Sequence, residues 1–418
     1  MTLIGRTRRS EQDGEIDGPG GEDGEAPGLS RRRFAQLLGA GVAAAGGAGL
    51  TAAVPARAAA LRGWGRAAAS APLRGVPSAG AQGIAGVVRL SSNENPYGPS
   101  PAAFDAMRGA FDLAWRYPDE HVEALAEDVA RLHGVDPAQV LLGAGSSEIL
   151  LLAAVAFTAP GRPAVAAEPT FESLPRHARR HGAEALAVPL TADFRHDLPK
   201  MLAAAPDPGL LYVCNPNNPT ATITPKAELR SLLAKAPERT LVAVDEAYFH
   251  FADSDDFESV IPLVASHPNL LVTRTFSKIY GMAGLRCGYG VAQPAVVARL
   301  RDHQAFDSVN ILALAAARAS LHDAGQVSRG QRLNREVKAA VCAELDRLGF
   351  AYIPSATNFM MIDLRRPVGP VIQELRRRNV EVGRVFPALP HHLRVTIGTA
   401  DQMQAFLGAF GQVVAGRG

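Results

Sequence analysis

The ten residues Ser277–Arg286 read SKIYGMAGLR and are the most informative stretch of this chain. Lys278 follows the hydroxyls of Thr275 and Ser277, and Arg286 comes eight residues after it. An amine that is desolvated near cationic groups has a lowered pKa and becomes a nucleophile toward an aldehyde. Hydroxyls and a guanidinium can hold a phosphate group. An ordinary solvated lysine is the alternative, but the chain has only five lysines.

A second informative feature is the apolar run Leu241–Asp245, which ends in a carboxylate. A buried carboxylate is costly unless it is paired, so a structural salt bridge is one explanation. Opposite a pyridinium nitrogen, Asp245 would keep that nitrogen protonated, and Tyr248 could donate to the phenolic oxygen of the same ring. A reactive lysine, a phosphate site and this aspartate together predict pyridoxal 5'-phosphate (PLP) as the cofactor.

The glycine-rich turn Gly143–Glu148 precedes a predicted helix. Glycines permit close backbone approach, and a helix N-terminus favours an anion, so this turn is a second candidate for phosphate binding. A plain helix cap, with Ser146 or Ser147 as the capping residue, is the alternative. The presence of Lys278 in the same chain favours the phosphate interpretation.

The chain alternates short apolar runs with helix-like stretches after about residue 85. Helices are expected over 122–132, 147–156 and 226–234, and buried strands are expected over 140–142, 164–167, 185–189, 210–214, 241–245 and 270–273. This alternation predicts an α/β fold with a largely parallel sheet covered on both faces. Ligands of such sheets bind at the carboxyl ends of strands, where Asp245 and Lys278 are expected.

Bulk composition limits the possible partners. The 418 residues are 47% hydrophobic and carry a formal net charge of +2, so nothing indicates nucleic acid binding. Cys214, Cys287 and Cys342 lack metal-ligand spacing, and no metal site is predicted.

We expect a large PLP-binding domain over 116–327 and a small α+β domain over 328–418. In the latter, a long charged helix over 331–348 leads to a strand over 359–364, a helix over 369–379 and a strand near 392–397. Residues 88–115 are expected to form an N-terminal arm that joins the small domain, because the large-sheet pattern has not begun there.

The N-terminus has the composition of a targeting segment. Residues 1–60 begin with a polar, acidic stretch, which is followed by an arginine run that includes Arg31 and Arg32. An apolar Ala/Gly-rich stretch and an A-x-A cleavage site at 56–58 come next. Residues 61–87 are expected to form a linker. The pattern resembles a twin-arginine (Tat) signal, which implies the Tat translocase as a partner and export to the periplasm or the extracellular space. A low-complexity tail is the alternative, and the protein is cytoplasmic if the signal is not used.

Taken together, these motifs resemble those of fold-type I, class I/II aminotransferases, and most closely the histidinol-phosphate aminotransferase branch. The matching segments follow the family's order and are 93–99, 116–119, 143–148, 217–220, 244–248, 275–286 and 393–398. The resemblance implies the PLP-transferase fold type I, with a mostly parallel seven-stranded sheet and a smaller α+β domain. It also implies ping-pong transfer of an amino group between an amino acid, or histidinol phosphate, and a 2-oxo acid.

The resemblance implies a role for each matching residue. Lys278 would carry the cofactor and move protons as general acid and base, Asp245 would hold the pyridinium, and Tyr248 and Asn218 would contact the phenolic oxygen. Phe171 would stack on the ring, and Tyr117 would reach the phosphate across the interface of a homodimer. The remaining phosphate ligands would be Gly145, Ser146, Thr275, Ser277 and Arg286. Substrate would be bound by Tyr97, Asn358, Arg384 and Arg394.

Two alternatives to an aminotransferase remain open at this point. The same fold and cofactor serve decarboxylases, lyases and oxidases, but Arg394 as a carboxylate clamp favours transamination. A PLP-binding regulator is less compatible with a chain that has Lys278, Asp245 and Arg286 and an export-like N-terminus. For Arg384, binding of a distal substrate anion and a surface salt bridge are both possible.

Overall fold

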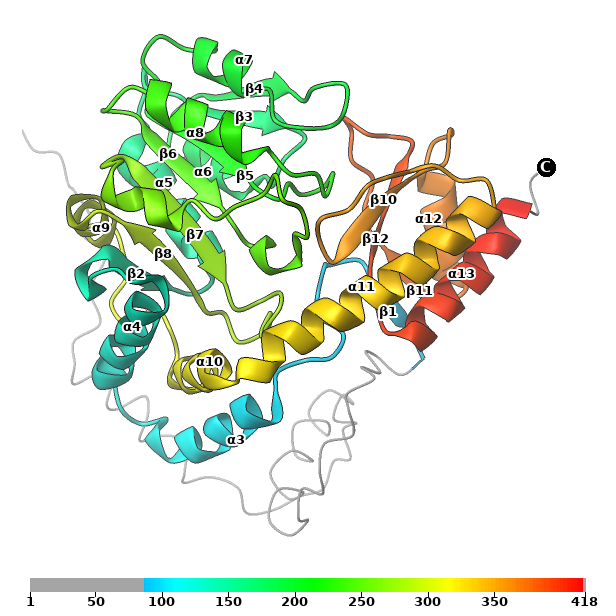
Figure 1. The fold of residues 1–418 in the computed structure, drawn as a ribbon, viewed down its shortest axis with the longest axis horizontal. Helices are drawn as coiled ribbons and strands as arrows, with labels where there is room; N and C mark the ends of the chain where they lie inside the picture. Colours follow the sequence, from blue (N-terminus) through cyan, green and yellow to red (C-terminus); the bar gives the residue numbers. More distant parts are fainter. Residues whose placement is uncertain (1–85, 416–418) are drawn as a thin grey trace, which may run out of the picture. The chain divides into compact units, whose positions relative to one another are not determined.

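The computed structural model describes residues 86–415 (Figure 1). The Tat-like signal over 1–60 and nearly all of the linker over 61–87 lie outside these residues. Among the described helices, none is both long and apolar enough to span a membrane.

The central element is a seven-stranded sheet with the strand order β2-β8-β7-β6-β5-β3-β4. All neighbouring strands are parallel except β8, which is antiparallel to both β2 and β7. The predicted mostly parallel seven-stranded sheet is therefore confirmed. The strands are β2 (Val140–Gly143), β3 (Ala164–Glu168), β4 (Ala185–Pro189), β5 (Leu210–Cys214), β6 (Leu241–Asp245), β7 (Leu270–Thr275) and β8 (Gly288–Ala292).

Alternate residues of the central strands enter two separate hydrophobic cores. In β5, Leu211 and Val213 belong to one core, whereas Leu210 and Tyr212 belong to the other. This alternation is the two-residue period of a strand that is buried on both faces. The first core includes α4 (Asp119–His133), α7 (Leu198–Ala203), α8 (Lys226–Lys235) and α10 (Ile311–His322), and the second includes α5 (Ser146–Phe157), α6 (Ser173–Arg180) and α9 (Pro294–Arg301).

The C-terminal part forms a third core around a three-stranded sheet of order β12-β10-β9. Met360, Ile362, Phe406 and Phe410 are fully buried there, and α12 and α13 lie beside β10 and β12 (Figure 1). We propose these residues as the small domain. Its elements are α11 (Ala324–Arg347), β9 (Tyr352–Ile353), β10 (Phe359–Asp363), α12 (Gly369–Arg377), β11 (Val380–Val382), β12 (His392–Thr396) and α13 (Ala400–Ala415).

The long helix α11 begins at Ala324, earlier than the start predicted at residue 331. Gly325 and Gly330 are weak helix formers and hid this start. Asp323 caps the helix by accepting a hydrogen bond from the amide of Gly325 at 3.1 Å. Gly330 packs closely against Ile279, because a Cβ there would lie 2.8 Å from Cδ1 of Ile279 and the isoleucine side chain would have to shift.

The N-terminal arm contacts both parts of the protein. The strand β1 (Val88–Leu90) pairs in parallel with β11, and Leu90 is buried in the third core. The helix α3 (Pro101–Ala110) packs against α10 instead. Short 3-10 helices cover Phe111–Leu113, Pro137–Gln139, Phe249–Phe251 and Ile261–Ala265.

Candidate active site

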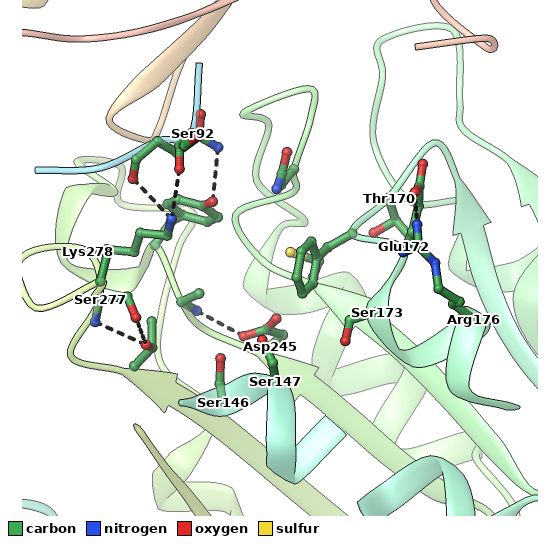
Figure 2. Close-up of a pocket in the computed structure, with 18 of the residues that line it drawn as sticks. Ser92, Ser146, Ser147, Thr170, Glu172, Ser173, Arg176, Asp245, Ser277 and Lys278 are labelled. Atoms are coloured by element: carbon green, nitrogen blue, oxygen red, sulfur yellow. Dashed lines mark hydrogen bonds and ion pairs between the residues drawn. The ribbon is translucent and has the colours of Figure 1, made fainter. Parts of the chain in front are cut away.

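A cavity of about 520 Å³ opens at the carboxyl edge of the large sheet (Figure 2). Because β5 and β6 are parallel and in register, they bring Cys214 and Asp245 to the same edge, and Lys278 follows the end of β7 nearby. The cavity collects eleven of the predicted site residues, namely Ser146, Phe171, Asn218, Asp245, Tyr248, Thr275, Ser277, Lys278, Arg286, Arg384 and Arg394.

Lys278 points its amine toward the N-terminal arm. Its Nζ donates hydrogen bonds to the carbonyl oxygens of Asn93 at 3.0 Å and Ser92 at 3.4 Å. Burial, and secondarily the positive charge of Arg394, lower the pKa of Lys278 from 10.5 to about 8. At pH 7 roughly a tenth of this amine is therefore neutral, and nucleophilic.

Asp245 is a buried carboxylate, with 1% of its surface exposed. It accepts hydrogen bonds from the hydroxyls of Tyr212 and Thr273, each at 3.1 Å, and from the amide of Ala247 at 3.2 Å. Burial raises its pKa to about 6, against the lowering by these hydrogen bonds. Within residues 86–415 no ion pair involves Asp245, so the structural salt bridge is not formed, and the site fits a pyridinium as the missing cation.

The phosphate-binding candidates form a connected cradle beside the start of α5. Nη1 of Arg286 donates to Oγ of Ser277 at 3.3 Å, Nη2 donates to the carbonyl of Ala144 at 3.2 Å, and the hydroxyl of Thr275 donates to Ser277 at 2.9 Å. Gly145 has φ +82°, and a Cβ there would lie 2.3 Å from Nη2 of Arg286. The positive φ favours glycine here, and a Cβ would also push the guanidinium of Arg286 aside. The donors of this cradle fit a phosphate.

Arg394 reaches the cavity from β12. Its Nη1 donates to Oδ1 of Asn218 at 2.7 Å and its Nη2 donates to the carbonyl of Ser91 at 2.8 Å, whereas its buried Nε has no hydrogen-bond partner. Burial lowers the pKa of this guanidinium. A guanidinium that is largely buried and lines a cavity is suited to bind a substrate anion.

Four predicted site residues are not among those lining the cavity. Gly145 lies next to the guanidinium of Arg286, which leaves no room for a Cβ. Asn358 donates to the carbonyls of Asn93 at 3.2 Å and Glu94 at 3.3 Å, so it holds the arm that Lys278 contacts. Tyr97 is partly buried, and Tyr117 is 82% exposed.

Arg384 lines the cavity and forms an ion pair with Glu172. The salt bridge that the sequence left open is therefore one of its contacts in this structure. Its guanidinium also lies 4.4 Å from the ring centroid of Phe386. Binding of a substrate anion by Arg384 stays a prediction.

Sequence reasoning missed two residues that contact the expected catalytic groups. Nδ2 of Asn93 donates to the hydroxyl of Tyr248 at 3.1 Å, and Tyr212 hydrogen-bonds Asp245 from the neighbouring strand. Asn93 lies in the segment 93–99, which resembles the family but has no chemical signal of its own, and Tyr212 looks like an ordinary core residue in the sequence. The only available signal was its place in the neighbouring strand, two residues before Cys214, which is the register partner of Asp245.

A model of the family described as aminotransferase class I and II matches residues 85–410 of this chain. The chain belongs to this family. A histidinol-phosphate aminotransferase of Symbiobacterium thermophilum is 44% identical over 329 residues, which cover 78% of this chain and 90% of that protein. A histidinol-phosphate aminotransferase of Pseudomonas aeruginosa is 44% identical over 334 residues, covering 79% and 90%.

Solved structures agree with this assignment. The histidinol-phosphate aminotransferase of Sinorhizobium meliloti, in complex with PLP, superimposes with a TM-score of 0.74 at 28% identity and covers 79% of this chain and 91% of that one. The family, the fold, the transaminase class and PLP as the cofactor are thus confirmed. The comparisons do not favour the decarboxylase, lyase or oxidase alternative.

Proposed function

We propose that this aminotransferase uses histidinol phosphate as its amino donor and a 2-oxo acid as its acceptor. The names of relatives that are 38–44% identical over most of the chain support this substrate. The observation that carries the proposal is the buried guanidinium of Arg394, which lines the same cavity as Lys278 and can bind a substrate anion. A general or aromatic amino-acid aminotransferase is the alternative.

Bound PLP supplies an electron sink for the bond that breaks at the amino carbon of the substrate. In our proposal, Lys278 would carry the cofactor, and its freed amine would then move the proton from that carbon to the cofactor carbon C4′, as its lowered pKa of about 8 favours. Asp245 keeps the ring nitrogen protonated. Tyr248, held by Asn93, and Asn218, held by Arg394, orient the phenolic oxygen of the ring.

Binding of the phosphate and the ring follows from the same geometry. Gly145, Ser146, Thr275, Ser277 and Arg286 would hold the cofactor phosphate at the start of α5, where the helix dipole favours an anion. Separately, Phe171, which lines the cavity, would stack on the ring.

The substrate assignment is tested by comparing kcat/KM for histidinol phosphate and for aromatic amino acids, in the wild type and in Arg384→Ala. Loss of one charge-assisted contact is expected to cost on the order of 10²-fold, and only for the phosphorylated substrate. Equal losses for both substrates, or a wild type that does not convert histidinol phosphate, would support the alternative.

We also propose that the active unit is a homodimer. Phe111, Trp115 and Tyr117 are 60%, 76% and 82% exposed, and a second copy would cover such an aromatic group. Tyr117 would then contribute to the partner's phosphate site, with Tyr97 on the substrate side. Sedimentation of the purified protein measures this directly, since Trp115→Asp should give monomers that bind PLP weakly. A wild type that sediments as a monomer would refute the proposal.

Export is a further proposal, supported by the arginine run and the apolar stretch that follows it in the sequence. Replacing Arg31 and Arg32 by lysine should leave the unprocessed protein in the cytoplasm. Lysine carries the same charge, so retention would report recognition of the guanidinium pair. Unchanged export of this variant would restore the low-complexity alternative.

A further inference from the structure

The cavity carries more positive charge than the cofactor accounts for. Arg176, Arg180 and Arg384 line it, together with the carboxylate of Glu172. In Figure 2, Glu172 and Arg176 lie on the side of the cavity opposite Lys278. The other charged residues that line the cavity, Asp245, Lys278, Arg286 and Arg394, lie in the cofactor and amino-carbon region discussed above.

Glu172 cannot neutralise this group alone. Its Oε2 accepts a hydrogen bond from Nη2 of Arg176 at 2.9 Å, and its Oε1 pairs with Arg384. Arg180, by contrast, forms no ion pair with any residue in the range 86–415. Two of the three guanidiniums therefore share one carboxylate, and the third has none.

The positions of Arg176 and Arg180 are set by α6. They are four residues apart and consequently lie on one face of the helix, the face that also presents His177 to the cavity. Burial, followed by the charges of Arg180 and Arg176, lowers the pKa of His177, as a positive local potential requires. Arg179 belongs to the same helix but does not line this cavity.

We propose that Arg180 and Arg176 form a subsite for an anionic group that the substrate carries at a distance from its reacting carbon. This proposal rests on the proposed function, in which the anion is the phosphate ester of the amino donor. The second carboxylate of a dicarboxylic 2-oxo acid has the same chemistry and is the other possible source. Glu172 acts as a positioning residue that holds Arg176 and Arg384 on either side of the subsite.

The test uses the PLP-loaded enzyme and the variants Arg180→Gln, Arg176→Gln and Arg179→Gln. We expect the first two to raise KM for histidinol phosphate on the order of 10- to 100-fold, the value of one charge-assisted hydrogen bond, with little change in kcat. KM for histidinol, which lacks the phosphate, should not change. The matched control Arg179→Gln should behave as the wild type with both compounds.

A binding measurement separates this proposal from the proposed function. In the loaded enzyme the cofactor phosphate fills the cradle at Arg286, so calorimetric titration with inorganic phosphate reports the second subsite. Phosphate binding that is lost in Arg180→Gln and kept in Arg179→Gln would support the subsite. This holds even if the wild type does not convert histidinol phosphate, because that failure would refute only the proposed amino donor.

A second experiment measures KM for the amino acceptors 2-oxoglutarate and pyruvate in the same variants. If Arg180→Gln and Arg176→Gln raise KM for 2-oxoglutarate, but not for pyruvate or histidinol phosphate, the subsite is supported and its ligand is the dicarboxylic acid. If Arg180→Gln and Arg176→Gln match Arg179→Gln in phosphate binding and in KM for histidinol phosphate and 2-oxoglutarate, the proposal is overturned.

Discussion

Replacing Asp245 by asparagine is expected to stabilise the cofactor-free protein while it impairs catalysis. The carboxylate is 1% exposed and forms no ion pair with the described residues. Burial raises its pKa from 3.8 to about 6 in the folded protein. In the variant, Oδ1 can still accept from Thr273 and Ala247, and the new amide can donate to the hydroxyl of Tyr212.

The raised pKa determines the sign and size of the effect. Below the unfolded pKa the carboxyl is protonated in both states and costs nothing. As the pH rises from the unfolded pKa of 3.8 to the folded pKa of about 6, the carboxyl ionises in the unfolded chain but stays protonated in the folded protein, so stability is lost. Above the folded pKa the loss is complete, because the carboxyl is ionised in both states. Because the pKa is raised by roughly two, the buried carboxyl lowers the free energy of unfolding by ~3 kcal/mol at pH 8 and by about half of that at pH 5.

Urea unfolding of the cofactor-free wild type and of Asp245→Asn at the two pH values measures this difference. The free energy of unfolding of the variant should exceed that of the wild type, and the excess should grow between pH 5 and pH 8. Asp253→Asn, at an exposed position, is the control and should show no such growth. A constant or negative excess for Asp245→Asn would refute the argument, and kcat close to that of the wild type would make Asp245 merely structural, since the expected loss is ~10²–10⁴-fold.

Three further predictions concern the same cavity. The rate of PLP uptake by the cofactor-free protein, followed by stopped-flow absorbance, should rise with pH and level off above about 8, because Lys278 reacts as the neutral amine; a pH-independent rate would contradict this. Gly145→Ala should weaken PLP affinity at least ~10-fold in fluorescence titrations because its Cβ displaces Arg286. Gly161→Ala, with a similar φ of +81° and open space, should not weaken it; equal effects would mean that backbone strain alone is responsible. Arg394→Lys should raise KM for the amino donor ~10²-fold, since lysine lacks the bidentate fork; an unchanged KM would exclude Arg394 as the anion ligand.

Much of the large sheet could be predicted because its strands are short apolar runs between turn residues. The runs 185–189, 210–214 and 241–245 match β4, β5 and β6 residue for residue. The strand β8 was missed because Gly288 and Gly290 interrupt its apolar pattern. Gly288 is there for packing, since a Cβ would lie 2.4 Å from the amide nitrogen of Ser146.

Some residues of the candidate site could likewise be predicted from the sequence, and others could not. Asp245 and Lys278 were identifiable because polar residues that directly follow buried strands meet at one edge of a parallel sheet. The contact of Lys278 with Asn93 joins residues 185 positions apart, and only tertiary packing brings them together. The arginines of α6 gave no signal in a chain that is rich in arginine, and a role for Tyr117 depends on a second copy of the chain.

The central claim is that Lys278 carries the cofactor. Borohydride reduction of the PLP-loaded protein followed by peptide mass spectrometry tests it most directly. We predict one labelled peptide, which contains Lys278, and no label in Lys278→Ala. Lys338 is the natural competitor, because burial lowers its pKa as well, although its amine donates to the carbonyls of Ser355 and Thr357. Label on Lys338, or label that persists in Lys278→Ala, would contradict the account.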